Sequence, residues 1–248
     1  MAWYAYCITE QRNFQGNYRA RRPFPIEGLR GVGGAQVIGY PSGDFAVIAS
    51  EYVRTGTLDQ KCAVEHARVI GECFRSGTVL PFKFGTVFDT DEAMRQAVRN
   101  NRKTFLESVA HLRGKSEMHV KVVVPKAVLA AGPGDDLEVP AAVGSEYLTK
   151  LRLKATRDRE RQTKARALSL QVHKLFNPID EEITCKQADS GALLIDIAHL
   201  IDSKMVEKYQ NRLSTATKQL KDCEIAISGP WPPYHFMPDK LRLVNGNS

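Results

Sequence analysis

The segment Gly229-Pro230-Trp231-Pro232-Pro233-Tyr234-His235-Phe236 constrains the fold of this chain more than any other stretch. Three prolines in four residues exclude a helix and a central position in a sheet, because proline has no backbone N–H to donate. The residue before each proline is also restricted to extended conformations. The segment therefore predicts a stiff, extended aromatic strip that either covers the protein's own core or forms a surface for a partner.

The composition is typical of a folded intracellular protein. The chain has 248 residues, 43% apolar and 25% charged, enough for one large domain or two ordinary ones. No apolar run approaches the roughly 18 to 20 residues that span a bilayer, and residues 1–8 lack the basic leader of a signal peptide. The five cysteines are odd in number and have no Cys-x-x-Cys spacing, which argues against disulfides and a cysteine zinc site. We expect a cytoplasmic protein without membrane contact.

Basic charge is concentrated in residues 150–166. The net charge of the chain is +7, and this segment has eight basic and two acidic residues, a local excess of six. The rest of the chain is nearly neutral, so the sequence predicts a local basic surface. Such a segment binds an acidic partner, forms a solvated helix face or contacts nucleic acid. The candidates for partner binding are Lys150, Arg152, Lys154, Arg157, Arg159, Arg161, Lys164 and Arg166.

The first part of the chain predicts an α+β domain over residues 1–119. Polar residues 11–25 are expected to form an exposed excursion. Two helices are expected, one at about 58–75 opened by a capping box from Thr57 and one opened by Asp89 that ends at Gly114. The order of elements predicts a mostly antiparallel sheet with helices on one face. Alternation and turn residues predict its strands at 2–8, 36–40, 45–50, 78–88 and 119–124.

Residues 120–248 predict a second domain of ferredoxin-like type. A linker at 125–144 leads into a long helix at about 145–176, whose middle lacks apolar residues and is therefore expected to project from the domain. With the strand that precedes the linker, the order strand, helix, strand, strand, helix, strand is typical of this fold. The later elements are strands at 183–188 and 192–199, a helix opened by Asp202 or Ser203, and a strand at 223–228.

Five aromatic side chains are candidates for packing between the two domains. Two of them alternate along the strand predicted at 78–88, and three lie in the proline strip, which leaves directly from the last predicted strand. Large aromatic side chains favour burial, so we expect the strip to return toward the first domain. The candidates are Phe82, Phe84, Trp231, Tyr234 and Phe236.

The chain has no recognisable catalytic motif, so we expect it not to be an enzyme and to hold no cofactor or metal. Walker, dinucleotide-binding and Gly-x-Ser-x-Gly patterns are absent. His111 and His119 near Glu117 lack the paired spacing of metal ligands. The three acids at 180–182 could bind a cation but are typical of a solvated turn. His66 is expected to be a helix histidine whose hydrogen bonds are satisfied and not a catalytic one, and a catalytic group assembled only in three dimensions remains an alternative.

Three segments of the chain together resemble the GvpF/GvpL family of gas vesicle accessory proteins. The first is Trp3-Tyr4-Ala5-Tyr6 with the later steps Gly28-Leu29 and Gly31-Val32. The second is His66 followed by residues 78–88, and the third is residues 227–236. Their order and spacing cover nearly the whole chain.

The resemblance implies two α+β domains, the second ferredoxin-like with a long projecting helix. It also implies a non-enzymatic structural role in gas vesicle assembly, through contacts with the hydrophobic shell protein and other accessory proteins, and no small-molecule substrate. The expected location is the inner surface of the gas vesicle or its assembly site. The resemblance does not separate F from L members. From the residues alone, the alternative is a nucleic-acid-binding module that uses the basic helix at 150–166.

Overall fold

The chain divides into two compact units. The computed structural model describes residues 2–13, 22–53, 57–125, 145–187 and 192–238. The first unit contains Met1–Glu117 together with the segment from Pro230 onward, and the second contains Met118–Gly229. The C-terminal segment, which we expected in the second domain, thus groups with the first unit. No helix in the described part of the chain is long and apolar enough to cross a membrane.

The first unit is built around β1 (Ala2–Glu10). Its sheet has the order β2-β3-β4-β1-β5, and β6 also pairs with β1. The side chains of β1 are buried at every position from Trp3 to Thr9, so both faces of this strand are covered. The other strands are β2 (Phe24–Arg30), β3 (Gln36–Ser42), β4 (Phe45–Tyr52), β5 (Val79–Pro81) and β6 (Val87–Phe88).

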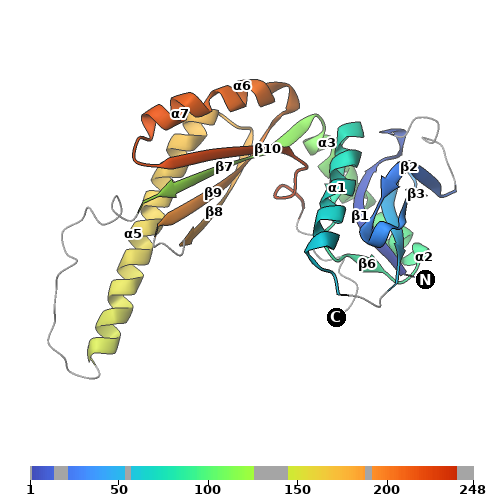
Figure 1. Ribbon diagram of the computed structural model, residues 1–248, viewed down its shortest axis with the longest axis horizontal. Coiled ribbons are helices and arrows are strands. Elements are labelled where there is room, and N and C mark those ends of the chain that lie inside the picture. The colour runs from blue at the N-terminus through green and yellow to red at the C-terminus, as the bar shows by residue number, and fades with distance from the viewer. Residues whose placement is uncertain (1, 14–21, 54–56, 126–144, 188–191, 239–248) are drawn as a thin grey trace. The chain divides into compact units, whose positions relative to one another are not determined.

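Helices cover both faces of this sheet, and the prediction of helices on one face is wrong. α1 (Gln60–Ser76) packs with Ala46 in one core cluster, whereas the ring of Phe45 contacts Phe105 of α3 (Arg102–Leu112) with centroids 6.2 Å apart. Successive residues of a strand point to opposite faces, so α1 and α3 lie on opposite sides (Figure 1). The physical reason is that β1 is apolar on both faces.

Strand β2 was not predicted. The excursion expected at 11–25 ends where β2 begins, at Phe24, and residues 14–21 lie outside the described part of the chain. The ring of Phe24 covers Gly39 of β3, where a Cβ atom would meet that ring at 2.5 Å. The small glycine therefore lets an aromatic residue close the sheet edge at this point.

Residues 78–88 form two short strands rather than one. β5 pairs with Cys7–Thr9 of β1, and β6 pairs with Trp3 and Tyr4. Between them the backbone turns at Gly85, which has a φ of 86° that side-chain-bearing residues rarely adopt. Phe82 is 5% exposed and Phe84 is 42% exposed, so the predicted aromatic strand face is wrong.

The first-unit helices begin at different caps from those predicted. Asp59, not Thr57, caps α1 and accepts a hydrogen bond from the Cys62 N–H at 2.9 Å. Thr90, not Asp89, caps α2 (Asp91–Asn100). The single helix expected from residue 89 to 114 is interrupted at Asn101, which separates α2 from α3.

The second unit is a four-stranded sheet with the order β10-β7-β9-β8. Its core lies between the sheet and the helices, with buried side chains from α5, α6, β7 and β9 (Figure 1). The single helix expected after residue 202 is a short 3-10 turn capped by Asp202, followed by two short helices that are separated at Arg212. Its elements are β7 (Lys115–Val124), α5 (Ser145–Phe176), β8 (Asp180–Gln187), β9 (Leu193–Asp202), α6 (Val206–Asn211), α7 (Leu213–Gln219) and β10 (Glu224–Trp231).

Strand β8 begins earlier than expected. The acids at 180–182 lie in this strand, where Glu181 pairs with His199 of β9, so the predicted solvated turn is wrong. The linker expected at 125–144 lies outside the described residues except for Pro125, as does the turn expected at 189–191.

Candidate functional site

The N-terminal half of α5 is the most exposed regular element of the second unit. All side chains from Leu148 to Glu160 are exposed, and the first buried side chain is Ala165. Residues 156–164 have no large apolar side chain to pack on the sheet. The helix therefore extends past the edge of the sheet, as Figure 1 shows for the yellow part of α5.

The eight basic residues predicted to bind a partner all lie on α5, on two opposite stripes. One stripe repeats every three or four residues and continues the helix face that further along buries Ala165 and Val172. That face therefore changes from apolar to basic where the helix leaves the sheet. The inner stripe is Lys150, Lys154, Arg157, Arg161 and Lys164, and the outer stripe is Arg152, Arg159 and Arg166.

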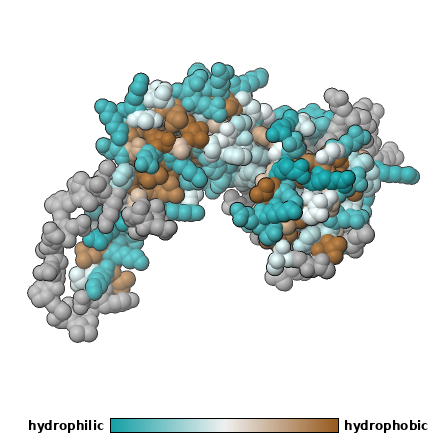
Figure 2. Space-filling model, viewed as in Figure 1, coloured by the Kyte–Doolittle hydropathy of each residue, from teal (hydrophilic) through white to brown (hydrophobic). Residues whose placement is uncertain are grey.

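Apolar side chains are interspersed with these basic groups. Leu148, Leu151 and Leu153 are 57%, 45% and 52% exposed. Figure 2 shows this half of the helix as mainly hydrophilic with separate hydrophobic positions. A surface that combines exposed leucines with cationic side chains can bury apolar area and attract acidic groups at the same time.

The proline strip is anchored to the first unit through Glu117. The Glu117 side chain is fully buried, and its two carboxylate oxygens accept hydrogen bonds from the backbone N–H and the Nδ1 of His235, at 2.8 and 2.7 Å. A carboxylate that accepts two such bonds is a strong anchor. The strip thus forms part of the first unit.

The aromatic side chains of the strip differ from its prolines in exposure. Pro232 and Pro233 are buried, whereas Trp231 is 47% exposed and Tyr234 is 36% exposed. Partial burial raises the pKa of Tyr234 to about 12, and the nearby Cys7 and Glu117 add to this effect. Phe236 is half-buried. The strip therefore buries Pro232 and Pro233 and leaves much of Trp231 accessible to solvent.

A buried hydrogen-bonded network connects β1, α1 and the turn after β5. The Tyr4 hydroxyl lies 3.1 Å from Nδ1 of His66 and accepts a hydrogen bond from the Gly85 N–H at 3.0 Å. Burial lowers the pKa of His66 to about 4, and a hydrogen bond to the backbone of Phe82 partly opposes this shift. His66 is therefore neutral at pH 7 and helps to fix the turn that exposes Phe84, and its partners agree with the expectation of a hydrogen-bonded helix histidine.

Tyr6 anchors the glycine loop after β2 in the same way. Its hydroxyl lies 2.7 Å from Ser50 Oγ and accepts a hydrogen bond from the Val32 N–H at 2.7 Å. A Cβ atom on Gly31 would lie 1.9 Å from that hydroxyl oxygen, so only glycine fits there. The aromatic and glycine residues that carry the resemblance thus have structural roles in the first unit.

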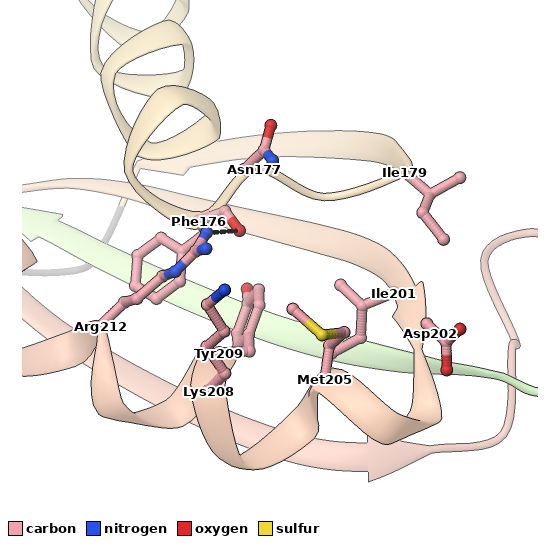
Figure 3. Close-up of a pocket in the computed structure, with 9 residues that line it drawn as sticks. All are labelled: Phe176, Asn177, Ile179, Ile201, Asp202, Met205, Lys208, Tyr209 and Arg212. Atoms are coloured by element: carbon pink, nitrogen blue, oxygen red, sulfur yellow. Dashed lines mark hydrogen bonds between the residues drawn. The ribbon is translucent and has the colours of Figure 1, made fainter.

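A pocket in the second unit lies between the end of α5 and α6 (Figure 3). Its lining includes the rings of Phe176 and Tyr209 and the side chains of Ile201 and Met205. Arg212 reaches back to the carbonyl oxygens of Phe176 and Leu175, which stabilises the C-terminal end of α5. The pocket is therefore small and largely apolar, and it lies beside the C-terminal end of α5.

Sequence reasoning missed the interactions that fix these surfaces. Glu117 and His235 are 118 residues apart, and Tyr4 and His66 are 62 residues apart. Neither pair follows a helix or strand period, so no spacing signal could have identified them. By contrast, the basic residues were found because they are adjacent on one helix.

Comparisons with known proteins agree with this architecture. Gas vesicle protein L of Streptomyces sp. strain CB03234 is 26% identical over 245 residues, covering 88% of this chain and 91% of that protein. Gas vesicle protein F2 of Halobacterium salinarum is 24% identical over 216 residues, covering 86% and 84%. The crystal structure of GvpF from Microcystis aeruginosa superimposes with a TM-score of 0.71 at 19% identity, covering 95% of this chain and 98% of that one.

The family match extends over both units. The family described as gas vesicle synthesis protein GvpL/GvpF matches residues 2–238. This range includes the aromatic strand β1, the turn after β5, α5 and the proline strip. The chain therefore belongs to the gas vesicle synthesis protein GvpL/GvpF family.

Proposed function

We propose that this protein is a non-enzymatic accessory protein of gas vesicle assembly that contacts the hydrophobic shell protein and other accessory proteins. Family membership supports a role in gas vesicle assembly. The exposed N-terminal half of α5 supports a role through contacts with partner proteins. The single observation that carries the proposal is that a helix face changes from apolar to basic where it leaves the core. We place the protein at the gas vesicle, on its inner surface or at its site of assembly.

The proposed contact uses the exposed leucines together with the basic stripes of α5. Exposed cationic side chains speed encounter with an acidic partner, and the leucines add apolar area once the surfaces meet. We further propose that the second unit is a ferredoxin-like domain. The strand order β10-β7-β9-β8 and the helices on one face support this assignment. In that fold, α5 is the first crossover helix, so its end is fixed by the sheet.

Nucleic-acid binding is the weaker alternative. Ferredoxin-like domains that bind single strands stack bases on aromatic side chains of the open sheet face. In the second unit that face presents His119, Lys121, Thr184 and Asp196, and the described strand residues between Met118 and Gly229 include no Phe, Tyr or Trp. A basic helix without a stacking surface favours a protein partner.

Co-purification with the shell protein tests the proposal. A tagged chain is co-expressed with the shell protein, and the amount of captured shell protein is measured by immunoblot. We expect neutralisation of either α5 stripe to reduce capture, and higher salt to reduce it further. Glutamine keeps the helix propensity of lysine and arginine. The inner-stripe variant is K150Q/K154Q/R157Q, and the outer-stripe variant is R152Q/R159Q/R166Q.

A third variant controls for net charge. K204Q/K218Q/K221Q removes the same amount of charge from exposed positions elsewhere in the second unit. We expect it to capture shell protein at the wild-type level. Wild-type capture by both α5 variants would show that the helix is not the contact. An equal loss in the control would show that only net charge matters. Stronger binding of a random oligonucleotide than of shell protein, lost steeply with salt, would favour the alternative.

A further inference from the structure

Three potential metal ligands converge inside the second unit from three different elements. His173 lies in the last turns of α5, Glu181 in β8 and His199 in β9. Nδ1 of His173 lies 3.3 Å from Oε2 of Glu181, and Nε2 of His199 lies 3.9 Å from the same oxygen. All three ligand atoms lie within 4.8 Å of one another.

The pairing of β8 with β9 and the position of α5 bring these three side chains together. Glu181 and His199 are direct partners in the antiparallel pairing of β8 and β9, so their side chains lie on the same face of the sheet. That face is covered by α5, whose Phe176 is part of the core. His173 precedes Phe176 by nearly one turn and therefore lies over the same pair.

The three converging atoms are buried and lack hydrogen-bond partners. Nδ1 of His173, Oε2 of Glu181 and Nε2 of His199 are all inaccessible to solvent, and none of them makes a hydrogen bond. The side chain of His199 as a whole is fully buried. A buried polar atom without a hydrogen-bond partner destabilises the folded chain, and native proteins rarely leave several of them facing one another. A cation that accepts one lone pair from each of the three atoms would remove this cost.

The second nitrogen of His199 is already engaged. Its Nδ1 lies 2.6 Å from the hydroxyl of Tyr209 on α6. When Nδ1–H donates to that oxygen, the lone pair is on Nε2, which faces Glu181. A partner that orients the ring and fixes its tautomer is typical of metal-ligating histidines.

The geometry points to a binding site for a divalent transition metal ion of the zinc type, held by His173 Nδ1, Glu181 Oε2 and His199 Nε2. Two imidazoles and one carboxylate form a donor set that zinc uses in proteins. Zinc bonds of about 2.0 to 2.2 Å in tetrahedral geometry place neighbouring ligand atoms about 3.3 to 3.6 Å apart. The 3.3 Å distance fits directly, and the 3.9 Å distance needs a closure of about 0.5 Å. Water would take the fourth position.

The bound ion would join the end of α5 to the two strands below it. This cross-link lies at the end of α5 opposite the exposed basic half. Its expected effect is structural, because metal that binds only the folded chain stabilises it. The inference does not depend on the proposed contact with the shell protein.

An ion pair between protonated His173 and Glu181 is the competing explanation. It would satisfy the 3.3 Å contact but would leave Nε2 of His199 without a partner. The two explanations differ in whether zinc raises the stability of the protein and whether cobalt acquires a tetrahedral ligand field.

Metal titration of the untagged, full-length chain tests the inference. After treatment with EDTA and desalting, zinc chloride is titrated by calorimetry, cobalt chloride by visible absorption, and Tm is measured with and without zinc. We expect one equivalent of zinc per chain, tetrahedral cobalt bands and a higher Tm with zinc. Magnesium chloride, whose ion prefers oxygen ligands, should neither bind at this site nor raise Tm.

Variants identify the ligands. E181Q and H173Q should abolish the cobalt bands and the zinc-dependent rise in Tm. Y209F keeps the ligands but removes the oxygen that orients His199, so zinc affinity should fall about 10- to 100-fold. H111Q changes an exposed histidine outside the cluster and should bind like the wild type. Each variant is first checked for a wild-type circular dichroism spectrum in EDTA.

Two results would overturn the inference. One is a wild-type chain whose Tm and cobalt spectrum do not respond to metal. The other is a folded H173Q or E181Q variant that keeps wild-type stoichiometry and affinity, which would place the metal elsewhere.

Discussion

His66 makes the stability of the first unit sensitive to acid. The folded chain holds this imidazole neutral with a pKa of about 4, whereas the unfolded chain has the ordinary value near 6.5. Between these values the unfolded state binds the additional proton, so stability is full above pH 6.5 and decreases as the pH falls toward 4. The difference corresponds to about 3 kcal/mol. We expect H66Q to be less stable at pH 7 but to lose less stability between pH 7 and 4, measured by urea unfolding. Parallel pH profiles for the two proteins would contradict this.

Gly31 tests the packing of Tyr6 at the same scale. The G31A variant places a Cβ atom against the Tyr6 hydroxyl, so we expect a loss of about 2 to 4 kcal/mol, in the upper range for single substitutions. Removing the hydroxyl with Y6F should recover part of this loss, even though Y6F alone costs the bonds to Ser50 and Val32. A double-mutant cycle from urea unfolding measures the coupling. Additive effects would mean that the two residues do not interact.

At the scale of elements, the hydrogen bonds of Glu117 hold the proline strip in place. E117Q replaces one accepting oxygen by an NH₂ group that faces a donor, so we expect a local loss of about 1.5 to 3 kcal/mol. Amide exchange at His235 should accelerate about 10- to 100-fold, while exchange in α5 stays unchanged. The E10Q variant, which neutralises the last residue of β1, serves as the control. Unchanged exchange at His235 in E117Q would exclude the anchor.

Elements with strong local signals could be predicted, and those set by distant contacts could not. α5 begins and ends at the expected residues. Its end could be predicted because Asn177 and Pro178 stop a long helical pattern. The strand predicted at 78–88 is wrong because Tyr4 and His66 fix a turn there. The break at Asn101 leaves the apolar spacing of the neighbouring helices almost unchanged, so the sequence pattern gave no sign of it.

The candidate site shows the same division. The basic stripes of α5 could be identified because their members are neighbours in sequence. His173, Glu181 and His199 could not, because they meet only through the register of β8 with β9 and the packing of α5 above it. The solvated turn predicted at Glu181 is wrong because this residue lies in β8 and pairs with His199.

At the scale of the whole molecule, the two units should respond differently to loss of the C-terminal segment. Because this segment groups with the first unit, a chain that stops after Gly229 should have a less stable first unit and an unchanged second unit. Hydrogen exchange separates the two, since amides of β1 and α1 report on one unit and amides of β9 on the other. Greater loss of protection in β9 than in β1 would contradict the assignment.

The grouping of residues before 118 and after 229 has a consequence for synthesis on the ribosome. The second unit is continuous in sequence, but the first unit is complete only when the strip around His235 has been made. At about 5 to 20 residues per second, translation of the intervening segment takes roughly 6 to 22 s. During this interval Glu117 has yet to meet its partner. The later-made unit can therefore close before the earlier one, an order of maturation opposite to the order of translation.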